Sequence, residues 1–177
     1  GTSTNMNANE VIANLALIEM GHRPGEYEYC SSHDHVNRSQ STNDAYPTAI
    51  HMGLYASHQA LLPHLKELIA ALRDKAEAFA HIVKMGRTQL EDAVPMTLGQ
   101  TFGGFASILE NELQHLEEAA ADFLTVNMGA TAIGTGICSE PGYAEKTVEA
   151  LARITGWHVV LATDWVGATS DTSCMVG

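Results

Sequence analysis

The feature that most constrains this chain is a stripe of apolar residues between Asp44 and Val83, spaced by threes, fours and one seven. Its members are Ile50, Leu54, Leu61, Leu65, Leu68, Leu72, Ala76, Phe79 and Val83. This spacing predicts one face of a long amphipathic helix that packs into a bundle. Pro47 suits the first turn of such a helix, whereas Pro63 lies inside it and predicts a kink or a short break.

A second stripe predicts a second long helix. It consists of Phe102, Phe105, Leu109, Leu113, Leu116, Ala120 and Phe123. Thr97 and Gln100 have the spacing of a capping box at its start, and residues 84–96 are expected to form a loop. No series of alternating strands occurs. The predicted fold class is therefore all-α, a bundle of long helices whose neighbours run antiparallel.

Shorter elements flank these two helices. Apolar spacing from Met6 to Ile18 predicts a helix that Ser3, Thr4 or Asn5 caps and that ends before Gly21. Residues 22–40 are expected to be a loop, residues 129–136 a structural glycine-rich turn, and residues 158–162 briefly extended. A further helix is expected from Pro141 and Tyr143 to just before Gly156.

The two ends of the chain predict a longer protein, and a domain boundary is expected at the start of the first long helix. Gly1 already lies in a helix-entry pattern and Gly177 lies inside another helix-like run, so we interpret the chain as truncated at both ends. Residues 1–43 are interpreted as the end of an N-terminal domain. Residues 44–177 are interpreted as the first part of a central helical-bundle domain.

Composition excludes several classes of function. With 45% hydrophobic and 17% charged residues the chain can form a core, and its net charge of -12 opposes nucleic-acid or anionic-membrane partners. Cys30, Cys138 and Cys174 form no CxxC pair, which argues against a disulfide framework and a zinc site. Because no signal sequence or membrane-length apolar run is present, we expect a cytoplasmic protein. His33-Asp34-His35 lacks a further ligand pattern, so no metal site is expected.

Three clusters of neutral hydrogen-bonding side chains remain. They are Thr2 to Asn5, Gln40 to Asn43, and the segment 86–95, which contains Thr88 and Gln89. Each has an ordinary interpretation as a helix cap or a solvated turn. The alternative is an anion site, because unpaired N–H groups and the helix dipole at a helix N-terminus already favour negative charge.

The length of the first long helix bears on where such a site would lie. A helix from Asp44 to Val83 would be about 60 Å long at 1.5 Å per residue. Ser41 to Asn43 and Thr88-Gln89 would then lie at its opposite ends. If both clusters serve one site, that site is built between copies of the chain, and the protein is an oligomer.

Four segments carry a family resemblance. GTSTNMNANEVIAN, DHVNRSQSTNDAYPTAI, KMGRTQLEDAVPMTLGQTFGGF and NMGATAIGTG, in this order, closely resemble the aspartase/fumarase superfamily over essentially the whole chain. GTSTNMN in place of GTQSNMN, and GRTQLEDAVPMTLGQ in place of GRTHTQDATPLTLGQ, resemble the ammonia-lyase branch more than the fumarases.

The resemblance implies reversible deamination of L-aspartate to fumarate and ammonia through an aci-carboxylate carbanion, in a homotetramer whose sites combine several subunits. It implies no cofactor and leaves activation by a divalent metal open. By matching motifs, Thr2, Ser41 and Thr42 would bind the β-carboxylate. Asn43, Thr88 and Gln89 would surround the α-amino group or neighbouring polar atoms.

Two departures from the family pattern matter. Ser31-Ser32-His33 stands where the family often has NPN, which puts an accessory anion contact there in doubt. The loop GSSxMPxKxNP, which carries the serine general base and a lysine for the α-carboxylate, does not occur in these 177 residues. We therefore expect no catalytic residue in this chain, and an inactive chain when it is isolated. A class II fumarate hydratase and a non-catalytic helical assembly fragment remain as alternatives.

Overall fold

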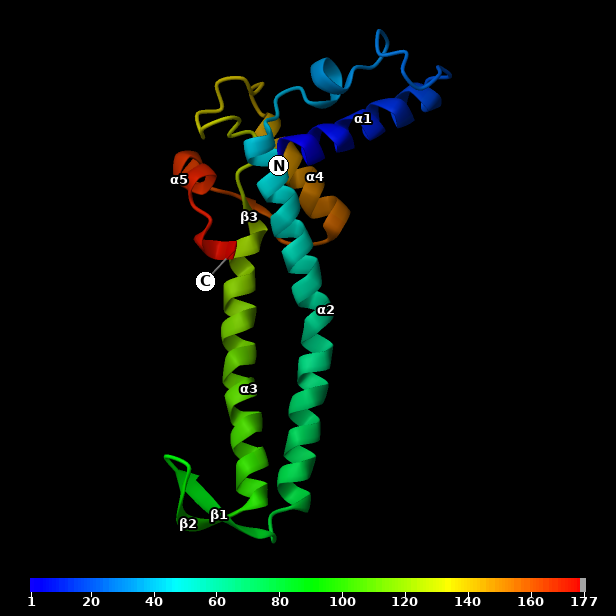
Figure 1. Ribbon diagram of the computed structural model, residues 1–177. Coiled ribbons are helices and arrows are strands. Elements are labelled where there is room, and N and C mark those ends of the chain that lie inside the picture. Colours follow the sequence, from blue (N-terminus) through cyan, green and yellow to red (C-terminus); the bar gives the residue numbers. More distant parts are fainter. Residues whose placement is uncertain (176–177) are drawn as a thin grey trace. The chain divides into compact units, whose positions relative to one another are not determined.

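The computed structural model describes residues 1–175, with the exception of the side chain of Cys174 (Figure 1). The end of the helix-like run expected to reach Gly177 lies outside these residues. The chain divides into two compact units, one formed by Gly1–Tyr55 with Ala121–Gly177 and the other by Ala56–Ala120.

A pair of long helices and a hairpin make up the second unit. It contains most of α2 (Thr42–Ala78), strands β1 (Val83–Thr88) and β2 (Glu91–Thr97), and α3 (Leu98–Ala120). Within this unit α2 and α3 lie side by side and antiparallel (Figure 1), as predicted. Lys66 Nζ lies 3.3 Å from a Glu117 carboxylate oxygen, and Arg73 forms an ion pair with Glu110 further along the two helices.

Two local predictions in this region need correction. No break occurs at Pro63, since α2 is a single helix of 37 residues, and this helix ends at Ala78 and not at Val83. The loop expected at residues 84–96 is a β-hairpin, in which β1 pairs antiparallel with β2. Gly86 permits close strand approach, because a Cβ there would lie 3.0 Å from the Val94 carbonyl oxygen.

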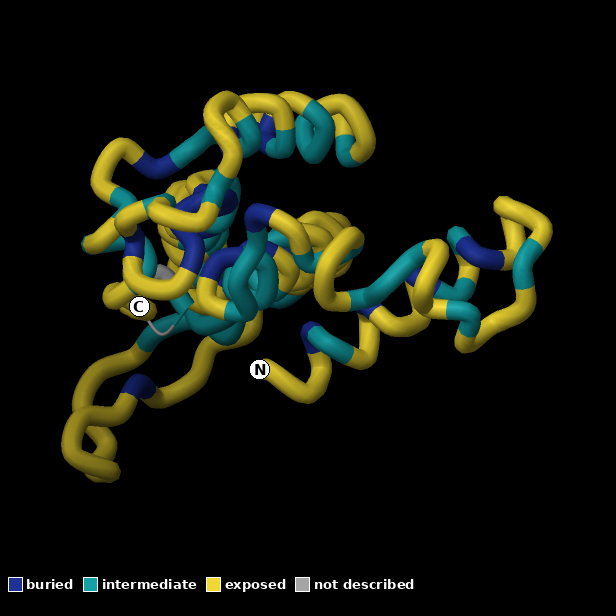
Figure 2. The backbone as a smooth tube through the Cα atoms, turned by 90° about the horizontal axis from the view of Figure 1, so that it is seen from above, coloured by how far each residue is buried: buried dark blue, intermediate teal, exposed yellow. Residues whose placement is uncertain are grey.

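The capping box at the start of α3 is confirmed. The Thr97 N–H donates to Gln100 Oε1 at 2.9 Å, and the Gln100 N–H donates to Thr97 Oγ1 at 3.1 Å. The apolar stripes are less buried than a core would be: Leu61 is 50% exposed, Leu68 49% and Phe105 52%. Many residues of the chain are likewise coloured as exposed in Figure 2. Two helices cover only one side of each other, so part of each stripe is left uncovered.

The first unit contains the shorter elements and a small apolar core. Its elements are α1 (Thr2–Glu19), a π-helical turn (Ser32–Val36), the start of α2, a 3-10 turn (Ala121–Leu124), β3 (Thr125–Val126), α4 (Tyr143–Thr155), β4 (Val160–Leu161), α5 (Trp165–Ser170) and a 3-10 turn (Ser173–Met175). Strands β3 and β4 pair in parallel. Val126, Met128, Val148 and Val159 form the core cluster.

The short-element predictions in this unit mostly agree with the structure. Helix α4 ends before Gly156, which adopts φ 73°, and Gly21 follows α1 at φ 84°. The predicted side-chain cap of α1 is wrong, because α1 begins at Thr2 and Gly1 occupies the cap position without a side-chain bond. No helix in the described residues is both long and apolar enough to cross a membrane. Cys30 and Cys138 are free thiols.

Candidate functional site

The N-termini of α1 and α2 meet at a pocket of about 590 Å³ in the first unit. A Cβ placed on Gly1 would lie 3.5 Å from Thr42 Cγ2, so the two helix starts are in contact. The lining residues are Gly1, Thr2, Thr42, Asn43, Tyr46, Pro47, Ala132, Ile133, Thr169 and Ser170. Three of the predicted site residues, Thr2, Thr42 and Asn43, therefore share one pocket.

The electrostatics of this pocket favour a negatively charged ligand. Each helix N-terminus presents backbone N–H groups and the positive end of a helix dipole. The pocket-lining side chains named above include no carboxylate and no cation; their polar groups are neutral hydroxyls and amides. Such a site attracts an anion through oriented neutral donors, which suits a carboxylate group.

Ser41 and Asp44 fix the start of α2 by a reciprocal cap. Ser41 Oγ accepts the Asn43 N–H at 3.1 Å, and the Ser41 N–H donates to Asp44 Oδ1 at 2.9 Å. This arrangement matches the serine and acidic positions of a capping box. The capping interpretation of Ser41 is thus correct, and a serine hydroxyl that accepts a hydrogen bond can also donate one.

Asp44 also holds a segment far away in the sequence. Its side chain is fully buried, and its Oδ2 accepts the Thr131 N–H at 2.8 Å. Burial raises the pKa of the Asp44 carboxyl above its ordinary value of 3.8, while the backbone N–H groups of Ser41 and Thr131 act in the opposite direction. Local spacing gives no signal for this role of Asp44, because its second partner is 87 positions away in the sequence.

Asn43 is tied to the same distant segment. Its Nδ2 donates to the Ala132 carbonyl oxygen at 2.7 Å, and its own carbonyl oxygen accepts from Asn127 Nδ2 at 3.2 Å. Asn127 Nδ2 also donates to Thr169 Oγ1 at 3.0 Å. The glycine-rich turn at 129–136 is therefore more than a connection, since Ala132 and Ile133 form one wall of the pocket.

Thr88 and Gln89 belong to the second unit, at the tip of its hairpin. Both are exposed. Gln89 and Leu90 adopt φ values of 51° and 67°, so the two turn residues both lie in the left-handed region. Arg87 Nε donates to Asp92 Oδ1 at 3.0 Å across the hairpin. Gln89 and the 94% exposed Leu90 therefore lie at the tip of two paired strands.

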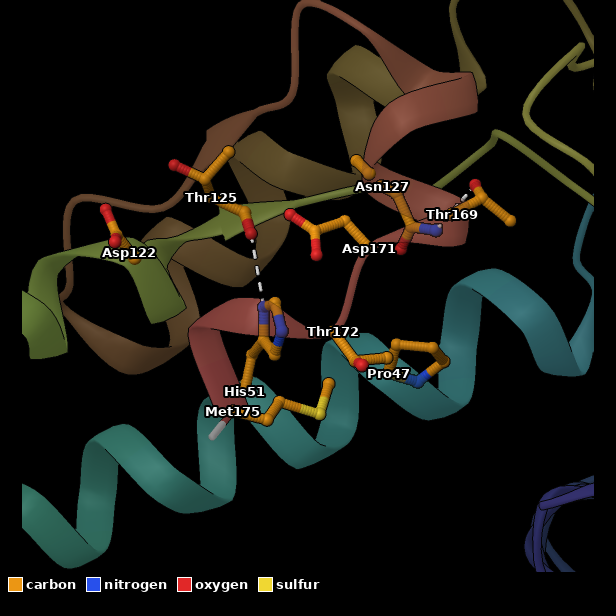
Figure 3. A pocket seen from close by; sticks show the side chains of 10 residues that line it. Pro47, His51, Asp122, Thr125, Asn127, Thr169, Asp171, Thr172 and Met175 are labelled. Atoms are coloured by element: carbon orange, nitrogen blue, oxygen red, sulfur yellow. Dashed lines mark hydrogen bonds between the residues drawn. The ribbon is translucent and has the colours of Figure 1, made fainter. Parts of the chain in front are cut away.

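A second pocket, of about 300 Å³, lies nearby in the first unit (Figure 3). His51 Nδ1 lies 3.2 Å from the Thr125 carbonyl oxygen there, and burial lowers the pKa of this histidine below 6.5. The pocket contains none of the predicted site residues. It is also lined by Asp122 and Asp171, whose carboxylates would repel an anionic substrate. We therefore favour the pocket at the two helix starts.

The histidine-rich turn does not form a metal centre. His35 Nδ1 accepts the Ser31 N–H at 2.9 Å, and His33 Nδ1 lies 3.2 Å from Asp34 Oδ1. Across residues 1–175, no group of three or more His, Cys, Asp or Glu side chains could hold a metal ion.

Paired long helices, with a pocket where two helix starts meet, define a helical-bundle protein. A family model described as "Lyase" matches residues 1–176, and the chain belongs to this family. Its bundle is of the aspartase/fumarase type.

Named relatives agree with this assignment. The chain is 56% identical over 177 residues to an aspartate ammonia-lyase of Pseudomonas fluorescens and 49% identical over 176 residues to one of Escherichia coli K12. Each match covers 99% of this chain and 37% of the relative. The chain thus spans well under half the length of these curated relatives.

Two solved structures share the fold. A fumarate lyase:delta crystallin from Brucella melitensis bound to cobalt superimposes with a TM-score of 0.94 at 48% identity, over 99% of this chain and 38% of that one. A recombinant class II fumarase from Schistosoma mansoni gives a TM-score of 0.82 at 31% identity, over 95% of this chain and 38% of that one.

Proposed function

We propose that the protein containing these residues is an aspartate ammonia-lyase, which reversibly deaminates L-aspartate to fumarate and ammonia. The observation that carries the proposal is the pocket in which Thr2, Thr42 and Asn43 line the junction of two helix N-termini. Similarity to aspartate ammonia-lyases at 49% to 56% identity supports the choice of reaction.

The chemistry requires stabilisation of a carboxylate whose charge grows during reaction. Removal of a C3 proton from aspartate leaves two electrons on C3, and these delocalise into the β-carboxylate as an aci-carboxylate dianion. The electrons then return to form the C2–C3 double bond as the C2–N bond breaks and ammonia leaves. Neutral hydroxyl and amide donors that already point at the carboxylate stabilise this developing negative charge by hydrogen bonding. No cofactor is required for such a sequence.

The individual roles are proposed from the family motifs that these residues match, and the shared pocket of Thr2, Thr42 and Asn43 supports them. Thr2 and Thr42, with Ser41 beside them at the cap of α2, bind the β-carboxylate. Asn43 lies next to the amino group, although one of its amide hydrogens is already donated to Ala132. Thr88 and Gln89, at the hairpin tip, complete the contacts to the amino group. The general base comes from a segment outside these 177 residues, so the isolated chain is expected to be inactive.

The assembly is proposed to be a homotetramer with sites shared between subunits, located in the cytoplasm. The uncovered apolar stripes on α2 and α3 support association, because exposed Leu61, Leu68 and Phe105 would be buried by further helices. The length of α2 supports shared sites. A 37-residue helix is about 55 Å long, and in the sequence residues 41–43 precede it while Thr88 and Gln89 follow it.

The test is fumarate formation from L-aspartate by the protein expressed from its complete gene, followed by ultraviolet absorbance. Thr42→Val should lower kcat/KM by about 10²–10³-fold, because it removes one donor from the developing charge. Thr163→Val, an exposed threonine of the same unit, is the control and should leave the rate unchanged. Normal activity of Thr42→Val would refute the assigned site.

A class II fumarate hydratase is the second candidate, favoured by the fold shared with the Schistosoma mansoni enzyme. It would use the same carbanion with water as the leaving group. Competing ammonia and water additions to fumarate, measured on the intact protein, distinguish the two. If aspartate and fumarate neither react nor raise the melting temperature of a normally assembled oligomer, the protein is a helical assembly module.

A further inference from the structure

Asp44 lies outside the pocket lining and accepts hydrogen bonds from both walls of the pocket. One wall is the start of α2, with Thr42 and Asn43, and the other is the turn that contains Ala132 and Ile133. Asp44 is fully buried and does not line the pocket. Its two oxygens accept from different walls, Oδ1 from the Ser41 N–H and Oδ2 from the Thr131 N–H.

The turn held by Asp44 has an unfavourable local conformation. Thr131 adopts φ 60°, a left-handed value that a β-branched residue rarely takes. Thr131 is 3% exposed, and its hydroxyl has no hydrogen-bond partner among the described residues 1–175. Strained backbone of this kind persists only where the surroundings enforce it, and it clusters at functional sites. The Asp44 carboxyl group accepts the Thr131 N–H at 2.8 Å and so holds this backbone in place.

We propose that Asp44 is a positioning residue for the reaction: its carboxylate fixes the distance between the Thr42-Asn43 wall and the turn at Thr131, and so sets the pocket to the size of its substrate. The bond from Asn43 Nδ2 to the Ala132 carbonyl oxygen makes a second, neutral link between the same walls. This inference rests on the proposed function, since it concerns the site assigned there to the substrate carboxylate.

Two substitutions test the link. Asp44→Asn replaces one acceptor oxygen by a donor NH₂ and therefore cannot accept both N–H groups. Asp44→Glu is designed to keep the fold: glutamate at the third helical position is the preferred partner of a serine cap, so the bond to Ser41 survives while the second oxygen is displaced from Thr131. Asp74→Asn makes the same chemical change at an exposed position of α2 and serves as the control.

The measurements are steady-state kinetics and amide hydrogen exchange on the intact protein. Both Asp44 variants should lower kcat/KM for aspartate by about 10- to 100-fold, chiefly through a higher KM, with faster exchange at residues 129–136. A purely structural role would lower the melting temperature and the active fraction but leave KM unchanged. An unchanged KM in folded Asp44→Glu overturns the proposal, even if Asp44→Asn does not fold.

Hydrogen exchange separates this inference from the proposed function. If the wild-type protein does not deaminate aspartate, the proposed function fails while the link can still be tested. Faster exchange at 129–136 in folded Asp44→Glu, with none in Asp74→Asn, would then support the link between the walls. Unchanged exchange would overturn it.

Discussion

At the residue scale, His51 illustrates how burial sets a pH response. Its ring lies in the pocket of Figure 3, where burial lowers its pKa below 6.5 and the bond to the Thr125 carbonyl oxygen only partly offsets this. As pH falls through 6.5, the unfolded chain takes up the proton before the folded chain does. The stability contributed by neutral His51 is therefore complete above 6.5 and is lost as pH falls from there towards the folded pKa.

We predict that His51→Gln makes stability less dependent on pH. The free energy of unfolding of wild type, from urea titrations, should fall more steeply between about pH 7.5 and pH 5.5 than that of the variant. The comparison at pH 8, where the ring is neutral in both states, gives the baseline. Equal slopes for the two proteins would show that His51 does not titrate differently on folding.

Only some residues of the candidate site could be predicted from the sequence. Ser41, Thr42 and Asn43 could be found because a run of capping residues before an apolar stripe is a local signal. The role of Asp44 could not be predicted, since an aspartate in the first turn of a helix is common and needs no further explanation. Its burial depends on Thr131, and contacts between such distant positions leave no trace in local spacing.

At the element scale, Gly99 at the start of α3 lies very close to the backbone at the end of α2, where a larger residue would not fit. A Cβ on Gly99 would collide with the Ala76 carbonyl oxygen and would lie 2.8 Å from the Ala80 Cα. We predict that Gly99→Ala lowers the free energy of unfolding by about 1–3 kcal/mol, because neither backbone segment can yield easily.

Gly103, one turn further along α3, is the matched control. Its added Cβ would lie 3.7 Å from the Ala76 Cβ, an ordinary contact. Gly103→Ala should therefore gain up to about 1 kcal/mol from helix propensity. Urea unfolding at one fixed protein concentration measures both variants. A similar loss for both would mean that the close approach at Gly99 is not the cause.

The hairpin that follows α2 was missed for a related reason. Its two-residue turn, Gln89-Leu90, has positive φ at both positions, as in a type I′ turn. Such turns are usually signalled by Asn-Gly or Asp-Gly, and neither is present. Gly86 and Pro95 also favoured a loop. The capping box at Thr97, in contrast, could be predicted because it is complete within four residues.

We predict that Leu90→Gly stabilises the hairpin by about 1 kcal/mol, since glycine adopts a left-handed φ without steric cost. Leu90→Ala is the control: it keeps the Cβ and the strain, and should change little. Urea unfolding of both variants gives the comparison. If Leu90→Gly is instead destabilised, the 94% exposed leucine makes contacts in the assembled protein that a single chain lacks.

At the scale of the whole molecule, the apolar stripes predict helix faces that are more buried than they are in a single chain. The stripes at Leu61, Leu68 and Phe105 were correctly predicted as helix faces, yet these side chains are about half exposed. Sequence periodicity shows which face is apolar but not which molecule covers it. The fold class could therefore be predicted from the stripes, whereas the assembly remains a proposal.

The proposed assembly makes a prediction about mixed oligomers. If Thr42 of one copy and Gln89 of another serve the same site, Thr42→Val and Gln89→Ala proteins should each be nearly inactive alone. Unfolding and reassembling an equal mixture should restore about a quarter of the sites, those with wild-type residues from both contributing copies. The rate of fumarate formation after mixing, compared with each variant put through the same treatment, measures the effect. Activity no higher than the mean of the two variants would mean that each copy supplies both residues to its own site, and the shared-site proposal would fail.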